Sequence, residues 1–165
     1  MSVLGSGAGV SRREDRRRLL WAGRTTFDVV LDASHTQGTI ALLDQHGERG
    51  DATPVHIHHD ESEIFYVLDG TIVAWSGDER LTLGAGGALY LPAGSPHAFA
   101  VSSPTARLIS VTAPAGFAAF VQAAGVPVDG DVPATWEFDM GALMAASQEH
   151  RIEIVGPPPS LDGEE

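Results

Sequence analysis

The sequence GDATPVHIHHDESEIFYVLDG at residues 50–70 places His56, His58 and Glu63 close together in the chain. A second stretch, GGALYLPAGSPHAFAV at residues 86–101, adds His97. Side chains at positions i and i+2 of a β-strand point the same way, so one strand can aim both His56 and His58 at a single ion, whereas a helix would splay them apart. We therefore predict that His56, His58, Glu63 and His97 bind a metal ion.

The register between these ligands requires a break in the chain. Glu63 lies an odd number of residues after His58, so one unbroken strand would place it on the opposite face. We expect the polar segment 59–62 to form a turn or bulge that resets the register, and Glu63 to open a new strand over 63–68.

The second stretch is expected to place His97 at the start of a strand. Pro92, Gly94 and Pro96 are turn residues between a short strand at 89–91 and the strand 97–101. If His97 faces inward, Phe99 and Val101 do so too, and the site then lies in an apolar barrel interior.

With these two stretches in place, the sequence resembles the cupin superfamily. Both cupin motifs are present with their spacing, over residues 50–101. The second motif often ends in asparagine where this chain has Val101, a position that is not a metal ligand in the family pattern. The segments EIFYVLDG (63–70), PHAF (96–99) and PAGF (114–117) are similar to small quercetin-dioxygenase-like cupins, which extends the resemblance to about residues 24–125.

The resemblance implies a dioxygenase that acts on a small enediol or a flavonol-like aromatic compound. Its cofactor would be one divalent transition metal ion, and iron, manganese, nickel, copper and zinc all suit imidazole and carboxylate ligands. Glu63 would be both a ligand and the catalytic residue that accepts a substrate proton. Two other classes remain open: a metal-dependent isomerase, cyclase or decarboxylase that uses the ion as a Lewis acid, and a binding or sensor protein without turnover.

The period of two along the strands also suggests which residues line a substrate pocket. Phe65, Val67 and Phe99 share the inward face with the ligands, so we expect them to line an apolar pocket. Packing in the barrel core is the alternative role for each.

Other ionisable residues near the motif are assigned simpler roles. Glu61 could replace Glu63 as a ligand, but it falls in the expected turn and is interpreted as a solvated surface charge. His59 is expected beside the site or on the surface. His35, His46 and His150 have no partner at ligand spacing and are interpreted as surface or core residues.

Composition favours one soluble domain with a small-molecule substrate. The 165 residues carry a net charge of −12, and all ten basic residues are arginine. Such an acidic surface repels phosphate backbones, so nucleic acid is not an expected partner. Cysteine is absent, which excludes disulfides and thiolate ligands.

The ends of the chain are expected to differ from the barrel. Residues 1–20 are interpreted as a flexible, arginine-rich segment, 21–128 as the cupin barrel with a following short helix, and 129–165 as a C-terminal helix and extended tail without chemistry. The arginines at 12–18 could belong to a twin-arginine signal, but no apolar stretch follows them, and no run of 18 apolar residues exists. We therefore expect a cytoplasmic protein without a membrane partner.

Strand signals recur at short spacing and favour an all-β fold. We expect a double-stranded β-helix, the cupin jelly-roll barrel, with one or two short C-terminal helices. Phe117, Phe120 and Val121 mark one face of the first helix, which is expected to pack on the barrel, and Asp139 is a plausible N-cap of the second. From the resemblance and the strand-like segment 25–31, which could pair across subunits, we expect a homodimer.

Overall fold

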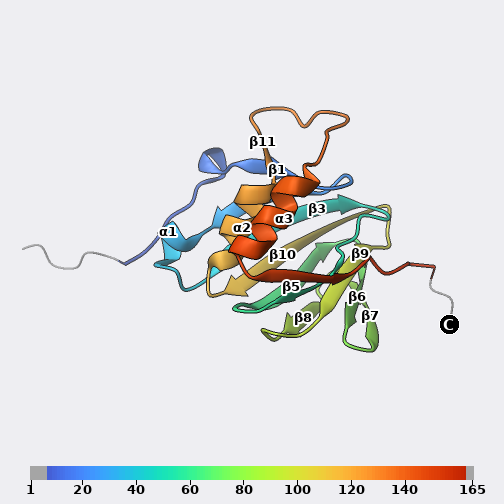
Figure 1. Ribbon diagram of the computed structural model, residues 1–165. Coiled ribbons are helices and arrows are strands. Elements are labelled where there is room, and N and C mark those ends of the chain that lie inside the picture. The colour runs from blue at the N-terminus through green and yellow to red at the C-terminus, as the bar shows by residue number, and fades with distance from the viewer. Residues whose placement is uncertain (1–6, 163–165) are drawn as a thin grey trace, which may run out of the picture.

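Two antiparallel sheets face each other and form the body of the protein (Figure 1). The computed structural model describes residues 7–162. The seven-stranded sheet has the order β11-β1-β2-β3-β10-β5-β8, and the five-stranded sheet has the order β12-β4-β9-β6-β7. The strands span Arg18–Leu20 (β1), Thr26–Leu31 (β2), Ala41–Glu48 (β3), Val55–His58 (β4), Ser62–Asp69 (β5), Thr71–Ser76 (β6), Glu79–Gly84 (β7), Ala88–Leu91 (β8), His97–Val101 (β9), Thr105–Ala113 (β10), Val126–Val128 (β11) and Ile152–Gly156 (β12).

Helices are few and short. The helices are α1 (Ala33–Thr36), α2 (Gly116–Ala124) and α3 (Met140–Glu149), with a 3₁₀ turn η1 at Arg13–Asp15. The Asp139 carboxylate accepts a hydrogen bond from the Ala142 N–H at 3.0 Å, which confirms it as the N-cap of α3. The predicted all-β fold, a double-stranded β-helix with short C-terminal helices, is confirmed.

The inward faces of the two sheets supply two apolar clusters. One contains Leu19, Phe27, Leu43, Phe120 and Leu143 among others, and so joins β1, β2 and β3 to α2 and α3. The other lies between β5, β10, β6 and β9 and includes Phe65, Val67, Ile72, Phe99 and Leu108. Alternation along the strands explains both clusters, because every second residue of a strand faces the opposite sheet.

The N-terminal segment joins the sheet earlier than the sequence indicates. Arg18–Leu20 forms β1, which pairs with both β2 and β11, and Leu19 is fully buried. The segment expected to be flexible therefore contributes a strand to the sheet, and its first six residues lie outside the described part of the chain. The apolar pair Leu19–Leu20 after the arginines accounts for this pairing, because the Leu19 side chain packs in the first apolar cluster.

The strand expected to pair across subunits is not an edge. β2 lies between β1 and β3 and bonds to both, so its backbone groups are already used. The edges of the two sheets are β11, β8, β12 and β7. The homodimer stays a prediction, but pairing through β2 cannot form it.

The C-terminal tail is an integral part of the barrel. Figure 1 shows α3 packed beside α2 and the chain then running across the front of the molecule as β12. β12 pairs with β4 through Ile152↔His58 and Ile154↔His56. Among the described residues, no helix has the length and apolar character needed to span a membrane.

Truncating a side chain in the second cluster should lower the stability of the protein. Leu108 is fully buried between β3 and β5, so Leu108→Ala removes apolar contacts and leaves a cavity, and we expect the free energy of unfolding to fall by about 3 kcal/mol. Leu68→Ala on the exposed face of β5 is the matched control, with an expected loss below about 0.5 kcal/mol. Urea unfolding of the two variants measures both values, and equal losses would contradict the assignment of Leu108 to the core.

Candidate metal centre

Four buried side chains from three strands converge at one point of the barrel interior. His56 and His58 come from β4, His97 from β9 and Glu63 from β5. One donor atom of each lies within 4.8 Å of the donors of the other three. His56 is the register partner of His97, while Glu63 reaches the site from the opposite sheet. The two sheets therefore meet at this group of residues.

The distances between donor atoms suit a single ion. Nε2 of His56 and Nε2 of His58 are 3.1 Å apart. Oε2 of Glu63 lies 3.4 Å from Nε2 of His97 and 3.8 Å from Nε2 of His58. Donors at the usual ~2.1 Å from a transition metal lie about 3.0 to 3.4 Å from each other, so small shifts would bring all four into coordination.

Two backbone carbonyls fix the ligand nitrogens of His56 and His97. Nδ1 of His56 donates to the carbonyl of Pro54 at 2.8 Å, and Nδ1 of His97 donates to the carbonyl of Ser95 at 2.9 Å. Each acceptor is two residues before its histidine. With the proton on Nδ1, the Nε2 lone pair of each ring points into the site, which is the arrangement that metal-binding histidines need. Nε2 of His97 is also buried without a hydrogen-bond partner in the described chain, as expected of a nitrogen atom that coordinates a metal ion.

Within the part of the chain that the structure describes, no backbone carbonyl orients the ring of His58, which packs against a neighbouring aromatic ring instead. Its Nδ1 is buried and has no hydrogen-bond partner among residues 7–162. Its ring lies against the ring of Phe117 from α2, with 4.8 Å between centroids. The first residues of α2 therefore cover the site from one side.

Burial and the neighbouring charges lower the pKa of His56 and His58 but raise the pKa of His97. Burial, followed by the charge of His97, lowers the pKa of His56 to about 3. Burial, followed by the charges of His56 and His97, lowers the pKa of His58 to about 2. Burial also acts to lower the pKa of His97, but the adjacent Glu63 carboxylate and the Ser95 carbonyl outweigh it and raise that pKa above 6.5. His56 and His58 are thus neutral ligands over the physiological range.

Glu61 is not the surface charge that the sequence indicates. It is buried at 5% exposure, and its carboxylate lies against Gly116 at the start of α2. Burial raises the pKa of Glu61 to about 7, and the charges of Asp60 and Glu63 add to this. The bend at 59–60 is the expected turn, but α2 packs over the residue that follows it. Glu61 is outside the ligand group, so Glu63 remains the carboxylate of the site.

The remaining histidines lie outside the cluster. His59 Nε2 pairs with the Glu153 carboxylate at 2.7 Å on the exposed side of the β4–β12 pair, which agrees with a role beside the site or on the surface. His35 takes part in capping α1 with Asp32, and His150 is the C-cap residue of α3.

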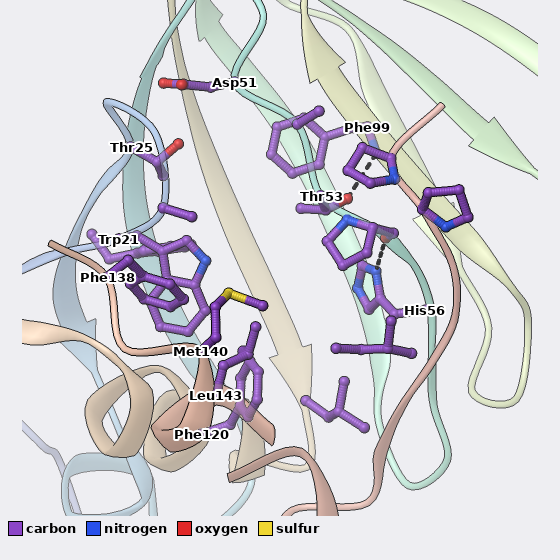
Figure 2. Close-up of a pocket in the computed structure, with 18 of the residues that line it drawn as sticks. Trp21, Thr25, Asp51, Thr53, His56, Phe99, Phe120, Phe138, Met140 and Leu143 are labelled. Atoms are coloured by element: carbon purple, nitrogen blue, oxygen red, sulfur yellow. Dashed lines mark hydrogen bonds between the residues drawn. The ribbon is translucent and has the colours of Figure 1, made fainter. Parts of the chain in front are cut away.

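An apolar cavity of about 540 Å³ reaches the centre at His56. Figure 2 shows Trp21 and Phe138 on one wall and Phe99, Thr53 and His56 on the opposite wall. Further apolar lining comes from β2, the helices α2 and α3, and the C-terminal tail, namely Phe27, Phe117, Phe120, Met140, Leu143, Met144, Ile152, Ile154, Pro157 and Pro158. This volume is within the usual range of pockets for small organic molecules.

Only part of the predicted pocket lines this cavity. Phe99 does, whereas Phe65 and Val67 are buried in the second cluster, where Phe65 meets the Phe99 ring edge-on at 5.1 Å between centroids. The period of two identifies the inward face correctly, but it does not distinguish the packed part of the interior from the open part. Trp21, Phe120 and Phe138 were not expected here, because their approach depends on long-range packing of β1, α2 and the tail.

Glu63 and Glu61 should differ in their effect on metal content. Glu63→Gln removes the anionic donor, so we expect metal bound per chain to fall at least about tenfold at limiting metal concentration. Glu61→Gln, a matched change two residues away, should leave metal content unchanged. Elemental analysis after gel filtration measures both, and a loss confined to Glu61→Gln would contradict this assignment.

Metal affinity should depend on pH through one histidine rather than three. His97 has a raised pKa, so protons compete for its Nε2 as the pH falls below that pKa, whereas His56 and His58 take up protons only in far stronger acid. We expect the apparent association constant to fall by about tenfold per pH unit between pH ~6 and ~5. Competition with a chelator corrected for its own titration measures this slope. A constant affinity, or a fall of about a thousandfold per unit, would contradict it.

Comparison with known proteins agrees with the fold. Residues 45–112 match the family model described as the cupin domain. Over 130 residues the chain is 28% identical to quercetin 2,3-dioxygenase of Bacillus subtilis (strain 168), which covers 79% of this chain and 36% of that protein. The chain thus spans about a third of the length of this relative.

Solved structures of other proteins have a similar fold. KdgF from a Halomonas species superimposes with a TM-score of 0.58 at 17% identity, over 64% of this chain and 94% of that one. The polyketide cyclase RemF from Streptomyces resistomycificus superimposes with a TM-score of 0.53 at 27% identity, over 62% and 76%. The matched residues 45–112 contain all four ligand positions and eight strands from β3 to β10 in whole or in part. The chain thus contains a cupin domain over residues 45–112.

Proposed function

We propose that this cupin is a metal-dependent dioxygenase for a small, planar compound that carries adjacent enol and carbonyl oxygens on a flavonol-like aromatic frame. The observation that carries the proposal is the junction between a three-histidine, one-glutamate donor set and an aromatic-lined cavity at His56. Four protein ligands leave coordination positions for a substrate on a five- or six-coordinate ion.

Similarity to quercetin 2,3-dioxygenase supports this choice of reaction. The 28% identity extends over 79% of this chain, and thus beyond the two metal-binding stretches. The relative is much longer, so its activity is carried to this chain as a proposal only.

The donor set fits a transition metal, because its imidazole nitrogens and its single carboxylate are the ligands such ions prefer. When bound, the ion would supply a Lewis acid that lowers the pKa of a substrate hydroxyl and favours reaction with dioxygen. A dioxygenase places both oxygen atoms of dioxygen in its product and takes the electrons from the substrate, so no external reductant is required.

The protein residues then have separate tasks. His56, His58 and His97 would hold the ion through neutral Nε2 atoms, two of them oriented by the carbonyls of Pro54 and Ser95. Glu63 would accept the proton of the substrate enol, since it is the carboxylate within the donor cluster. The aromatic walls would stack on the rings of the substrate and exclude water from the reacting atoms.

A cyclase without oxygen chemistry is the second candidate. The polyketide cyclase RemF is 27% identical over 62% of this chain, which is close to the identity of the dioxygenase relative. The same Lewis acid and the same apolar cavity would suit ring closure of a polyketide. Oxygen dependence separates the two reactions.

The metal-loaded protein should consume dioxygen when a flavonol is added. We expect His58→Gln to lower the rate of oxygen uptake by at least about a hundredfold, because it removes a ligand. His59→Gln is the matched control on the next residue, which pairs with Glu153 at the surface, and it should retain the rate. An oxygen electrode and the absorbance of the flavonol together give the rate and the stoichiometry.

The same assay under nitrogen distinguishes the alternatives. Equal conversion without dioxygen would replace the dioxygenase with the cyclase. Binding of the flavonol without conversion in either atmosphere would contradict both and support a binding protein.

A further inference from the structure

The cavity has polar side chains that the metal chemistry does not use. Its side-chain oxygen and nitrogen atoms belong to Trp21, Thr25, Gln45, Asp51, Thr53 and His56, and all other lining side chains are apolar. The Asp51 carboxylate already accepts from the N–H groups of Arg24 and Glu48, and the Thr53 hydroxyl accepts from the N–H of Phe99. His56 belongs to the metal centre. Besides the indole N–H of Trp21, the polar groups left without a structural task are those of Thr25 and Gln45.

Gln45 is a buried amide aimed into the cavity. It lies in β3 with 5% exposure, on the same face as Leu43. Its register partners are the inward-facing Phe27 of β2 and Leu108 of β10, both apolar. Within residues 7–162 its side chain makes no hydrogen bond, and its amide atoms are not among those sealed from solvent, so they face the cavity.

Thr25 lines the same cavity as this amide. It precedes β2 at 6% exposure, two residues before Phe27, and so shares the inward face with it. Because Phe27 is opposite Gln45, Thr25 is a diagonal neighbour of Gln45, at a spacing of about 7 Å between such positions. Its hydroxyl also lacks a hydrogen-bond partner in the described chain, and Figure 2 places it beside Trp21, across the cavity from His56.

Gln45 and His56 come from different sheets. Gln45 and Thr25 belong to the seven-stranded sheet and the loop that enters it, whereas His56 belongs to the five-stranded sheet. A molecule that fills the cavity and places its oxygens at the metal therefore extends toward Gln45. An unpaired buried amide weakens binding of an apolar group and favours a group that bonds to it.

We propose that Gln45 and Thr25 form a second binding subsite, which recognises a hydroxyl or carbonyl oxygen on the ring of the substrate that is remote from the metal. The amide offers both N–H donors and a carbonyl acceptor, and the hydroxyl offers one of each, so together they match a phenolic hydroxyl. The subsite rests on the proposed function, since the flavonol frame sets the metal-bound end. It selects among substrates by the oxygen at their far end.

Binding measured without dioxygen tests the subsite separately from the reaction. The probes are unsubstituted flavonol and two flavonols that each carry one extra hydroxyl, on one or the other terminal ring. Quenching of tryptophan fluorescence in the metal-loaded protein reports binding, because Trp21 lines the cavity. We expect one of the hydroxylated probes to bind about tenfold more tightly than unsubstituted flavonol, the effect of about one to two hydrogen bonds.

Two variants should remove this preference. Gln45→Leu and Thr25→Val keep the approximate size of each side chain and remove its hydrogen bonds, so the advantage of the hydroxylated probe should shrink to about twofold or less. Binding of unsubstituted flavonol should be unchanged or tighter. Gln122→Leu on the exposed face of α2 and Thr82→Val on β7 are the matched controls and should keep the preference.

The outcomes for the subsite and for the dioxygenase differ. Equal affinities for all probes in the unmodified protein, a preference that survives in Gln45→Leu and Thr25→Val, or no binding of any probe would overturn the subsite. A preference that is lost in both variants would support it, even if no probe consumes dioxygen and the proposed dioxygenase fails.

Discussion

The structure depends on the burial of four polar donors in an apolar barrel. Three imidazoles and one carboxylate lie at 8% exposure or less, where unpaired polar groups are costly. Two features lower this cost: backbone carbonyls accept one hydrogen bond each from the Nδ1–H groups of His56 and His97, and burial keeps His56 and His58 uncharged. The Glu63 carboxylate and the Nε2 atom of His97, which has no hydrogen-bond partner in the described chain, are groups that a cation would pair with. The barrel interior therefore holds a donor set that could bind a metal ion.

The site holds its geometry because each ligand comes from a strand that pairs elsewhere. β5 lies between β10 and β8, and β4 and β9 meet at His56↔His97. A shift of one residue in any of these registers would turn its ligand to the other face. The same constraint explains the bend at 59–60, which lets Glu63 face inward again after His58.

The ligand set and most strands can be predicted from sequence because they depend on local spacing. His56 and His58 share a face by the period of two, and the turn residues before His97 set its strand. The burial of Glu61 and the walls of the cavity depend instead on where α2, α3 and β12 pack. No local sequence pattern specifies this long-range packing. Phe65 and Phe99 show the limit most clearly: both face inward and their rings touch, but only Phe99 lines the cavity.

β12 links the C-terminal part of the described chain to the candidate ligands. The strand that carries two of the four candidate ligands has only a single register pair with β9, His56↔His97, and the longer of its two pairings is with β12. Residues 152–156 thus hold in place a strand from the first half of the chain. Segments with few partners open locally before the rest of a domain unfolds. Local opening of β12 would therefore loosen two of the four candidate ligands while the second apolar cluster stays packed.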